Sequence, residues 1–118
     1  MIDFLFVGIG GAVGAMLRYA ISMIPCKQTF PILTLIINIM GAVLIGYITG
    51  FATKGEMSRN VILLLKAGLC GGFTTFSTFS LEAYTLFQNG SYGYMVLYVF
   101  LSVVSCIIGV WCGSLLAN

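Results

Sequence analysis

Histidine is absent from this 118-residue chain, and acidic residues are few: Asp3, Glu56 and Glu82 are the three. Charged residues make up only 7% of the chain, whereas 60% of it is hydrophobic. A water-soluble globule of this size needs more polar surface than that, so lipid must cover most of the molecule. Only Glu82 falls within a long apolar segment, so paired acid–base catalysis and a proton relay lack their parts. We therefore expect a protein that is not an enzyme.

Other common kinds of site are also excluded by what is missing. The five basic residues are scattered and the net charge is only +2, which argues against nucleic acid as a partner. Without histidine, and without a C-x-x-C pair, no zinc or haem site is expected. We interpret the four cysteines as structural thiols in helices. They are Cys26, Cys70, Cys106 and Cys112.

Four apolar segments account for most of the chain: residues 4–24, 32–52, 61–87 and 94–116. Each can cross about 30 Å of hydrocarbon at roughly 1.5 Å per residue. Short connections with proline, glycine or charged residues separate them, so neighbouring segments should run antiparallel. The first segment is too long for a cleaved signal peptide and should stay. The sequence predicts an all-α, multi-pass protein of the cell membrane, with one domain over residues 1–118.

Glycine pairs at a spacing of four occur in every segment and predict close helix packing, because they place small residues on one helix face. A chain this short encloses little interior, so oligomerisation is also expected. The connections carry Lys54 and Arg59 on one side and Lys27 on the other, which is a weak orientation signal. One hypothesis is that copies insert both ways up and pair antiparallel. The alternative is a modest preference for both termini in the cytoplasm. The glycine pairs are Gly10 with Gly14, Gly46 with Gly50, Gly68 with Gly72, and Gly109 with Gly113.

The third segment combines poor helix formers with a run of hydroxyl residues at membrane depth. Gly71, Gly72, Thr74 and Thr75 would provide a break in the helix. Broken helices are tolerated in membranes where the freed carbonyls line a cavity or hold an ion. The alternative is a continuous, kinked helix whose hydroxyls bond back to the preceding turn.

Two other segments carry polar stripes. Thr34 and Asn38 lie four residues apart, and Tyr98, Ser102 and Ser105 follow at spacings of four and three. Each stripe therefore faces one side of its helix. Hydrogen bonding between helices explains one such stripe, but three polar stretches in so small a protein favour a pathway through the membrane.

Few groups in this pathway could act on an ion. Phe76 and Phe79 lie on one side of any helix that resumes after the break, and phenyl ring edges carry partial positive charge that can face an anion. Two cations lie within the spans, Arg18 late in the first and Lys66 early in the third. Arg18 either extends to the interface or lines a wet vestibule that gathers anions.

Three stretches of the chain resemble signature motifs of the Fluc (CrcB) fluoride channels. They are GGAVGAMLRY at residues 10–19, TLIINIMG at residues 34–41 and GGFTTFSTFS at residues 71–80. Their order and spacing also agree, and the likeness covers essentially the whole chain. Leu33, and Ser105 with Cys106, depart from the pattern of the family.

The resemblance implies passive export of cytoplasmic fluoride by an antiparallel dual-topology dimer with two narrow pores and a structural sodium ion at its centre. It matches Arg18 to a vestibule arginine and Glu82 to the acid just beyond the phenylalanine pair. The backbone carbonyls of Gly71 and Thr74 match the sodium ligands, with both copies contributing. Phe76, Phe79 and Asn38 match pore residues, and the further candidates along the polar track are Thr34, Ser77, Thr78, Tyr98 and Ser102.

Two readings from other classes remain. A small antiparallel drug/proton antiporter is also short and built of about four helices, but it needs a coupling carboxylate early in the chain, and the first segment has none. A membrane scaffold without transport gives no reason for the third motif. The near balance of loop charges favours pairing of identical chains over a heterodimer of related ones.

Overall fold

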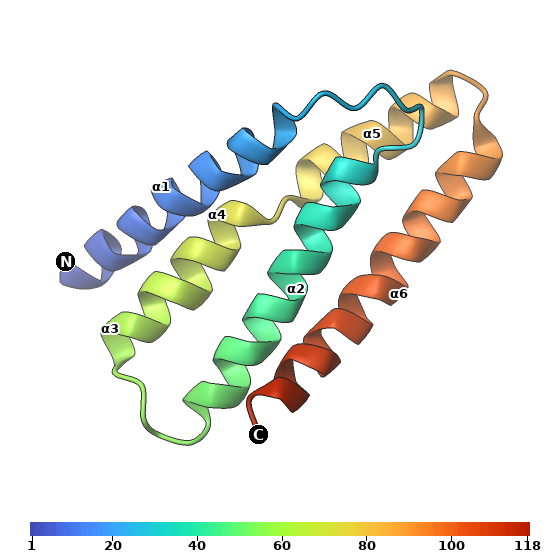
Figure 1. The fold of residues 1–118 in the computed structure, drawn as a ribbon. Coiled ribbons are helices and arrows are strands. Elements are labelled where there is room, and N and C mark those ends of the chain that lie inside the picture. Colours follow the sequence, from blue (N-terminus) through green and yellow to red (C-terminus); the bar gives the residue numbers. More distant parts are fainter.

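The computed structural model describes all 118 residues, and every regular element in it is helical (Figure 1). Four helices are long and apolar enough to cross a membrane, the third of them running from Arg59 to Gln88. This confirms the predicted four-span, multi-pass membrane protein. The elements are α1 (Ile2–Ser22), α2 (Ile32–Ala52), α3 (Arg59–Ile62), the π-helix η1 (Leu63–Cys70), α4 (Gly71–Phe73), α5 (Phe76–Gln88) and α6 (Tyr92–Leu116).

The observed bounds follow the predicted segments closely, and the second agrees to the residue. The third span begins two residues before the predicted residue 61, because the Ser58 side chain accepts a hydrogen bond from Val61 N–H and caps the helix. Hydropathy alone misses this polar first turn, which contains Arg59 and Asn60.

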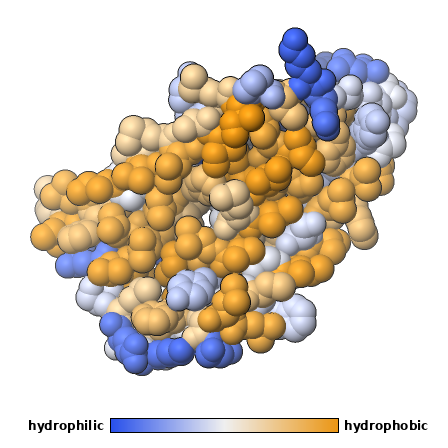
Figure 2. Space-filling model, viewed as in Figure 1, coloured by the Kyte–Doolittle hydropathy of each residue, from blue (hydrophilic) through white to orange (hydrophobic).

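Both termini and the α2–α3 connection lie at one end of the molecule, and the other two connections lie at the opposite end (Figure 1). We call these the termini end and the far end. At the termini end an Arg59 nitrogen lies 3.0 Å from an Asp3 carboxylate oxygen and links the start of α3 to the start of α1. Hydrophilic residues gather at the two ends of the visible face, and the surface between them is largely apolar (Figure 2). That pattern suits a bilayer-spanning molecule.

The third span is broken, as predicted, and the break changes its packing partner. Thr74 and Thr75 are extended, with ψ angles of 157° and 121°, whereas Gly71 and Gly72 remain helical in α4. Before the break, η1 and α4 run along α1; after it, α5 packs against α6 and α2. The break therefore brings the residues after it next to α2 and α6.

The glycine pairs pack helices together as predicted. In the α1 seam, a Cβ on Gly10 or Gly14 would collide with the Leu64 or Leu69 carbonyl oxygen of η1. In the α2–α6 seam, Gly46 meets the Val110 carbonyl in the same way. These backbones are too close for any side chain between them. Gly113 opposite Val43 and Gly72 opposite Gly11 follow the same pattern.

Candidate ion path

An open groove of about 500 Å³ lies between α2, the third span and α6. It gathers residues from three of the four spans at the level of the helix break. Its polar and aromatic lining includes six residues: Asn38, Thr74, Thr75, Phe76, Phe79 and Ser102. The same groove is lined by Lys66, Cys70, Gly71 and Cys106, and by no carboxylate.

Asn38 holds the break from the side of α2. Its Nδ2 donates to the Thr75 carbonyl at 3.1 Å, and Thr75 N–H donates to Asn38 Oδ1 at 2.9 Å. This pair of bonds satisfies both backbone groups of a residue that has left the helix, which membrane interiors require. An amide nitrogen carries two hydrogens, so Asn38 retains one donor for the groove that it lines.

The break releases two backbone carbonyls at the predicted sodium ligands. In an unbroken helix the amides of Thr75 and Thr78 would bond Gly71 O and Thr74 O. Here Thr75 N–H donates to Asn38, and Thr78 N–H donates to the Thr75 hydroxyl at 3.1 Å. Gly71 O and Thr74 O therefore lose their helical partners, and both residues line the groove. Carbonyl oxygens freed at a helix break are groups that can hold a sodium ion in membrane proteins.

Arg18 also acts at the break, because its Nε donates to the Gly72 carbonyl at 3.1 Å. The bond stabilises a carbonyl next to the break and links α1 to α4. Arg18 does not line the groove, and its terminal nitrogens take no further bond in the structure. The vestibule role predicted for Arg18 would depend on these free terminal nitrogens, and it stays a prediction.

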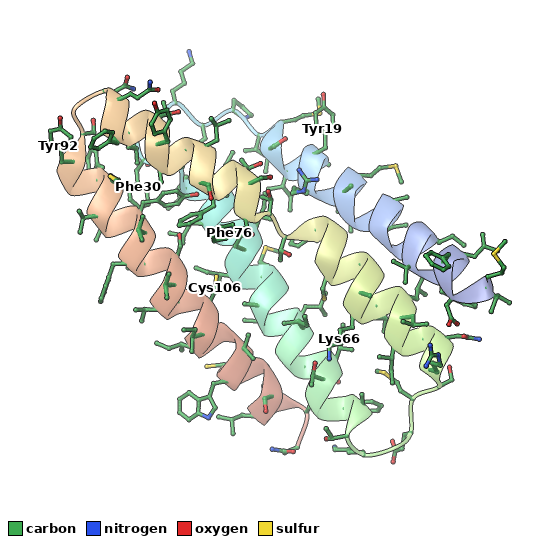
Figure 3. The ribbon with its side chains drawn as sticks, turned by 180° about the vertical axis from the view of Figure 1, so that it is seen from behind. Tyr19, Phe30, Lys66, Phe76, Tyr92 and Cys106 are labelled. Atoms are coloured by element: carbon green, nitrogen blue, oxygen red, sulfur yellow. The ribbon has the colours of Figure 1, made fainter.

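Three aromatic rings lie in a row from α5 to α6. Phe76 and Phe79 have ring centroids 5.5 Å apart, and Phe79 lies 5.1 Å from Tyr98. Phe76 is 79% exposed although it follows the break directly in the middle of the span, and Figure 3 shows it on the groove side of α5. Tyr98 is fully buried, and its hydroxyl donates to Glu82 at 3.0 Å. The one acid that lies in a span beyond its first turn is therefore tied to a tyrosine.

Ser102 presents the clearest unpaired donor of the path. It is buried, with 7% exposure, and its hydroxyl has no hydrogen-bond partner, yet it lines the groove. A buried hydroxyl without a partner is costly and needs an explanation. An anion in the groove would supply the missing acceptor. Cys106, one turn further along α6, also lines the groove with a weaker donor.

The predicted track is only partly gathered in this groove. Asn38, Phe76, Phe79, Ser102, Gly71 and Thr74 line it, whereas Thr34, Ser77, Thr78, Tyr98, Arg18 and Glu82 do not. Glu82 instead lines a second hollow of about 490 Å³ at the far end, with Thr85 and Asn89. Thr34 and Tyr98 are buried behind the lining, and Ser77 is exposed on α5.

Sequence reasoning missed Cys106 as a groove residue and missed the capping role of Thr75, although both signals were present. Cys106 follows Ser102 at a spacing of four and so belongs to the same face as the predicted stripe. Thr75 was expected to help break the helix, but its role as cap of α5 was not predicted. A threonine directly before the first residue of a helix is a known capping signal, because its hydroxyl can accept a hydrogen bond from the amide three residues later.

Four membrane spans with a polar groove at mid-span give this molecule the architecture of a small transport protein. The pattern of the CrcB-like protein family, Camphor Resistance (CrcB), matches residues 5–114. The chain belongs to the CrcB family.

Curated relatives match nearly the whole chain. The "Fluoride-specific ion channel FluC" of Ruminiclostridium cellulolyticum is 46% identical over 122 residues, which cover 100% of this chain and 94% of the relative. The protein of that name from Rhodopseudomonas palustris is 42% identical over 114 residues, or 93% and 92% of the two chains. The one from Methanococcus aeolicus is 37% identical over 118 residues, or 99% and 96%.

Proposed function

We propose that this protein is a fluoride-selective ion channel that lets cytoplasmic fluoride leave the cell down its gradient. The observation that carries the proposal is the groove at mid-span, which combines the fixed Asn38 amide, the unpaired Ser102 hydroxyl and two phenyl rings. The choice of fluoride as the ion comes from the names of the relatives.

Neutral donors suit fluoride for a physical reason. Fluoride is small and strongly hydrated, so a path must replace its water with close donors and still release it. Hydroxyl, amide and ring-edge donors do this without a full charge that would trap the ion. The drug/proton antiporter is disfavoured, because a coupling carboxylate should lie in the path, whereas Glu82 lies outside the groove and is bonded to Tyr98.

The transport test uses purified protein in liposomes loaded with fluoride, with no nucleotide and equal pH on both sides. A fluoride electrode should record efflux as soon as the fluoride gradient is allowed to run down. Efflux that starts only when a proton gradient is imposed would favour the antiporter and would rule out the channel.

We infer further that two copies pair antiparallel and that the pair contains two pores. Support comes from the open side of the groove, where Phe76 is mostly exposed and nothing lies within 4 Å of a Cβ placed on Gly71. Basic residues divide almost evenly, three toward the termini end and two toward the far end, so both orientations are accessible. Fluoride efflux from liposomes that contain this chain alone would distinguish self-pairing from a need for a related partner.

A structural sodium ion at the centre of that pair is part of the proposal. Gly71 O and Thr74 O have lost their helical partners in each copy, so an antiparallel pair would offer four oxygens around its axis. The ion would satisfy backbone groups of both chains at once. It would lie between the pores and would not move along them.

Removal of sodium should therefore reduce fluoride conduction or dimer stability. The measurement is fluoride efflux with sodium replaced on both sides by a large organic cation, with lithium and potassium as partial substitutes. Thr74→Ala is the matched control, because it keeps the main-chain oxygen and should keep the sodium requirement. Full and lasting efflux without any small cation would mean that no ion is needed.

The two phenylalanines give a second prediction. Phe76→Ile or Phe79→Ile keeps an apolar side chain but removes the positive ring edge, so fluoride efflux should fall while the protein stays folded. Phe51→Ile is the control, because Phe51 stacks on Tyr47 near the end of α2, away from the groove. Unchanged efflux in both single variants would make these rings ordinary packing residues. Roles for Thr34, Ser77, Thr78, Tyr98, Arg18 and Glu82 along the path stay predictions.

A further inference from the structure

Lys66 is the one charged residue of the groove, and neither the motifs nor the pore residues account for it. It lies on η1 and lines the same groove as Asn38, Phe76 and Ser102. In Figure 3 it lies nearer than Phe76 to the α2–α3 connection, so it marks the part of the groove toward the termini end.

The Lys66 ammonium has no partner within the chain. The single ion pair joins Arg59 to Asp3, and the single cation placed over a ring is Lys54 over Phe51. No carboxylate lines the groove. The positive charge of Lys66 is therefore free to act on ions in the groove.

Lys66 lies well before the helix break along the third span. It precedes Thr74 by eight residues, which is roughly 12 Å along a helix, and the break lies near the middle of the 30-residue span. A charge at this depth needs water or an anion nearby, and the groove supplies an opening for them. At this distance from the phenylalanines the ammonium can attract an anion without holding it in the pore.

We propose that Lys66 forms an anion-collecting site at the termini end of the groove. Its ammonium raises the local concentration of small hydrated anions, and Asn38 and the phenyl edges then take fluoride from that pool. The inference rests on the proposed channel function and adds to it a residue that sets the rate of ion entry. The alternative is a lysine that extends along the helix to the lipid headgroups and has no effect on the ion.

The test compares Lys66→Gln with the wild type in fluoride efflux from vesicles of neutral phosphatidylcholine. At about 10 mM ionic strength, where the screening length is about 30 Å, efflux through Lys66→Gln should be roughly threefold slower. At about 300 mM the two rates should converge, because salt screens the charge. Lys66→Arg keeps the charge and should match the wild type at both salt concentrations.

Lys54→Gln is the matched control, because it removes one positive charge from the same end of the molecule but outside the groove. It should leave efflux unchanged. Equal efflux rates for Lys66→Gln and the wild type at low salt would overturn the proposal. Slower efflux through Lys66→Gln that persists at high salt, or that Lys54→Gln shows as well, would also overturn it. A wild type that passes no fluoride at all would instead refute the proposed channel.

Discussion

Asn38→Ala should nearly abolish fluoride efflux and destabilise the protein. The substitution removes the donor to Thr75 O and the acceptor for Thr75 N–H, and it removes the spare donor in the groove. A fully buried backbone group left without a partner costs about 1–3 kcal/mol, and each of these two part-buried groups should cost less than the upper end of that range. A hydrogen bond to a charged group contributes about 1.5–3 kcal/mol, so loss of the ion contact alone should slow efflux roughly 10- to 100-fold. Efflux and thermal unfolding in detergent measure the two effects.

Two further variants separate the structural role of Asn38 from its role toward the ion. Asn38→Asp keeps an acceptor for Thr75 N–H but replaces the amide donor with a group that carries negative charge, so more of the fold than of the efflux should survive. Asn60→Ala is the control, because the Asn60 side chain makes no hydrogen bond and lies near the start of the third span. Wild-type efflux through Asn38→Ala would show that the α2 amide is not part of the path.

Gly14→Ala should cause a large loss of stability for so conservative a substitution. Its Cβ would collide with the Leu69 carbonyl oxygen and would lie 2.8 Å from Phe73 N, and neither backbone atom can rotate away. Overpacking of this kind costs about 1–3 kcal/mol. The displaced α1 would also pull Arg18, four residues later, from the Gly72 carbonyl. Lower thermal stability in detergent and reduced efflux are the expected readouts.

The control for this prediction lies in the same helix. Nothing lies within 4 Å of a Cβ placed on Gly8, so Gly8→Ala should fold as the wild type or slightly better, because alanine favours the helix. If Gly8→Ala and Gly14→Ala lowered stability equally, close packing of α1 against the third span would not be the cause.

Local patterns were sufficient to predict most of the fold. Long apolar runs placed the four spans, and glycines four residues apart identified the faces that pack, because both signals are carried by neighbouring residues. The run of glycine and hydroxyl residues indicated a broken third span. The position of the break depends on Asn38, which is distant in sequence and clamps Thr75. The sequence therefore named Thr74 and Thr75 correctly, but together with Gly71 and Gly72, which remain helical.

The site was predicted less completely, for the same physical reason. Spacing on one helix put Asn38 and Ser102 on polar faces, and both line the groove. The contacts of Arg18 with Gly72, and of Tyr98 with Glu82, depend on how separate helices meet. The antiparallel dimer and its sodium ion depend on a second copy and stay predictions.

The measurement that tests the central claim most directly is efflux of fluoride and of chloride from matched liposomes containing the purified wild-type protein. Rigid rings and close neutral donors should pass the small halide and reject the larger one, so fluoride should leave down its gradient while chloride passes very poorly. Comparable rates for the two ions, or no fluoride efflux beyond that of protein-free liposomes, would contradict the account.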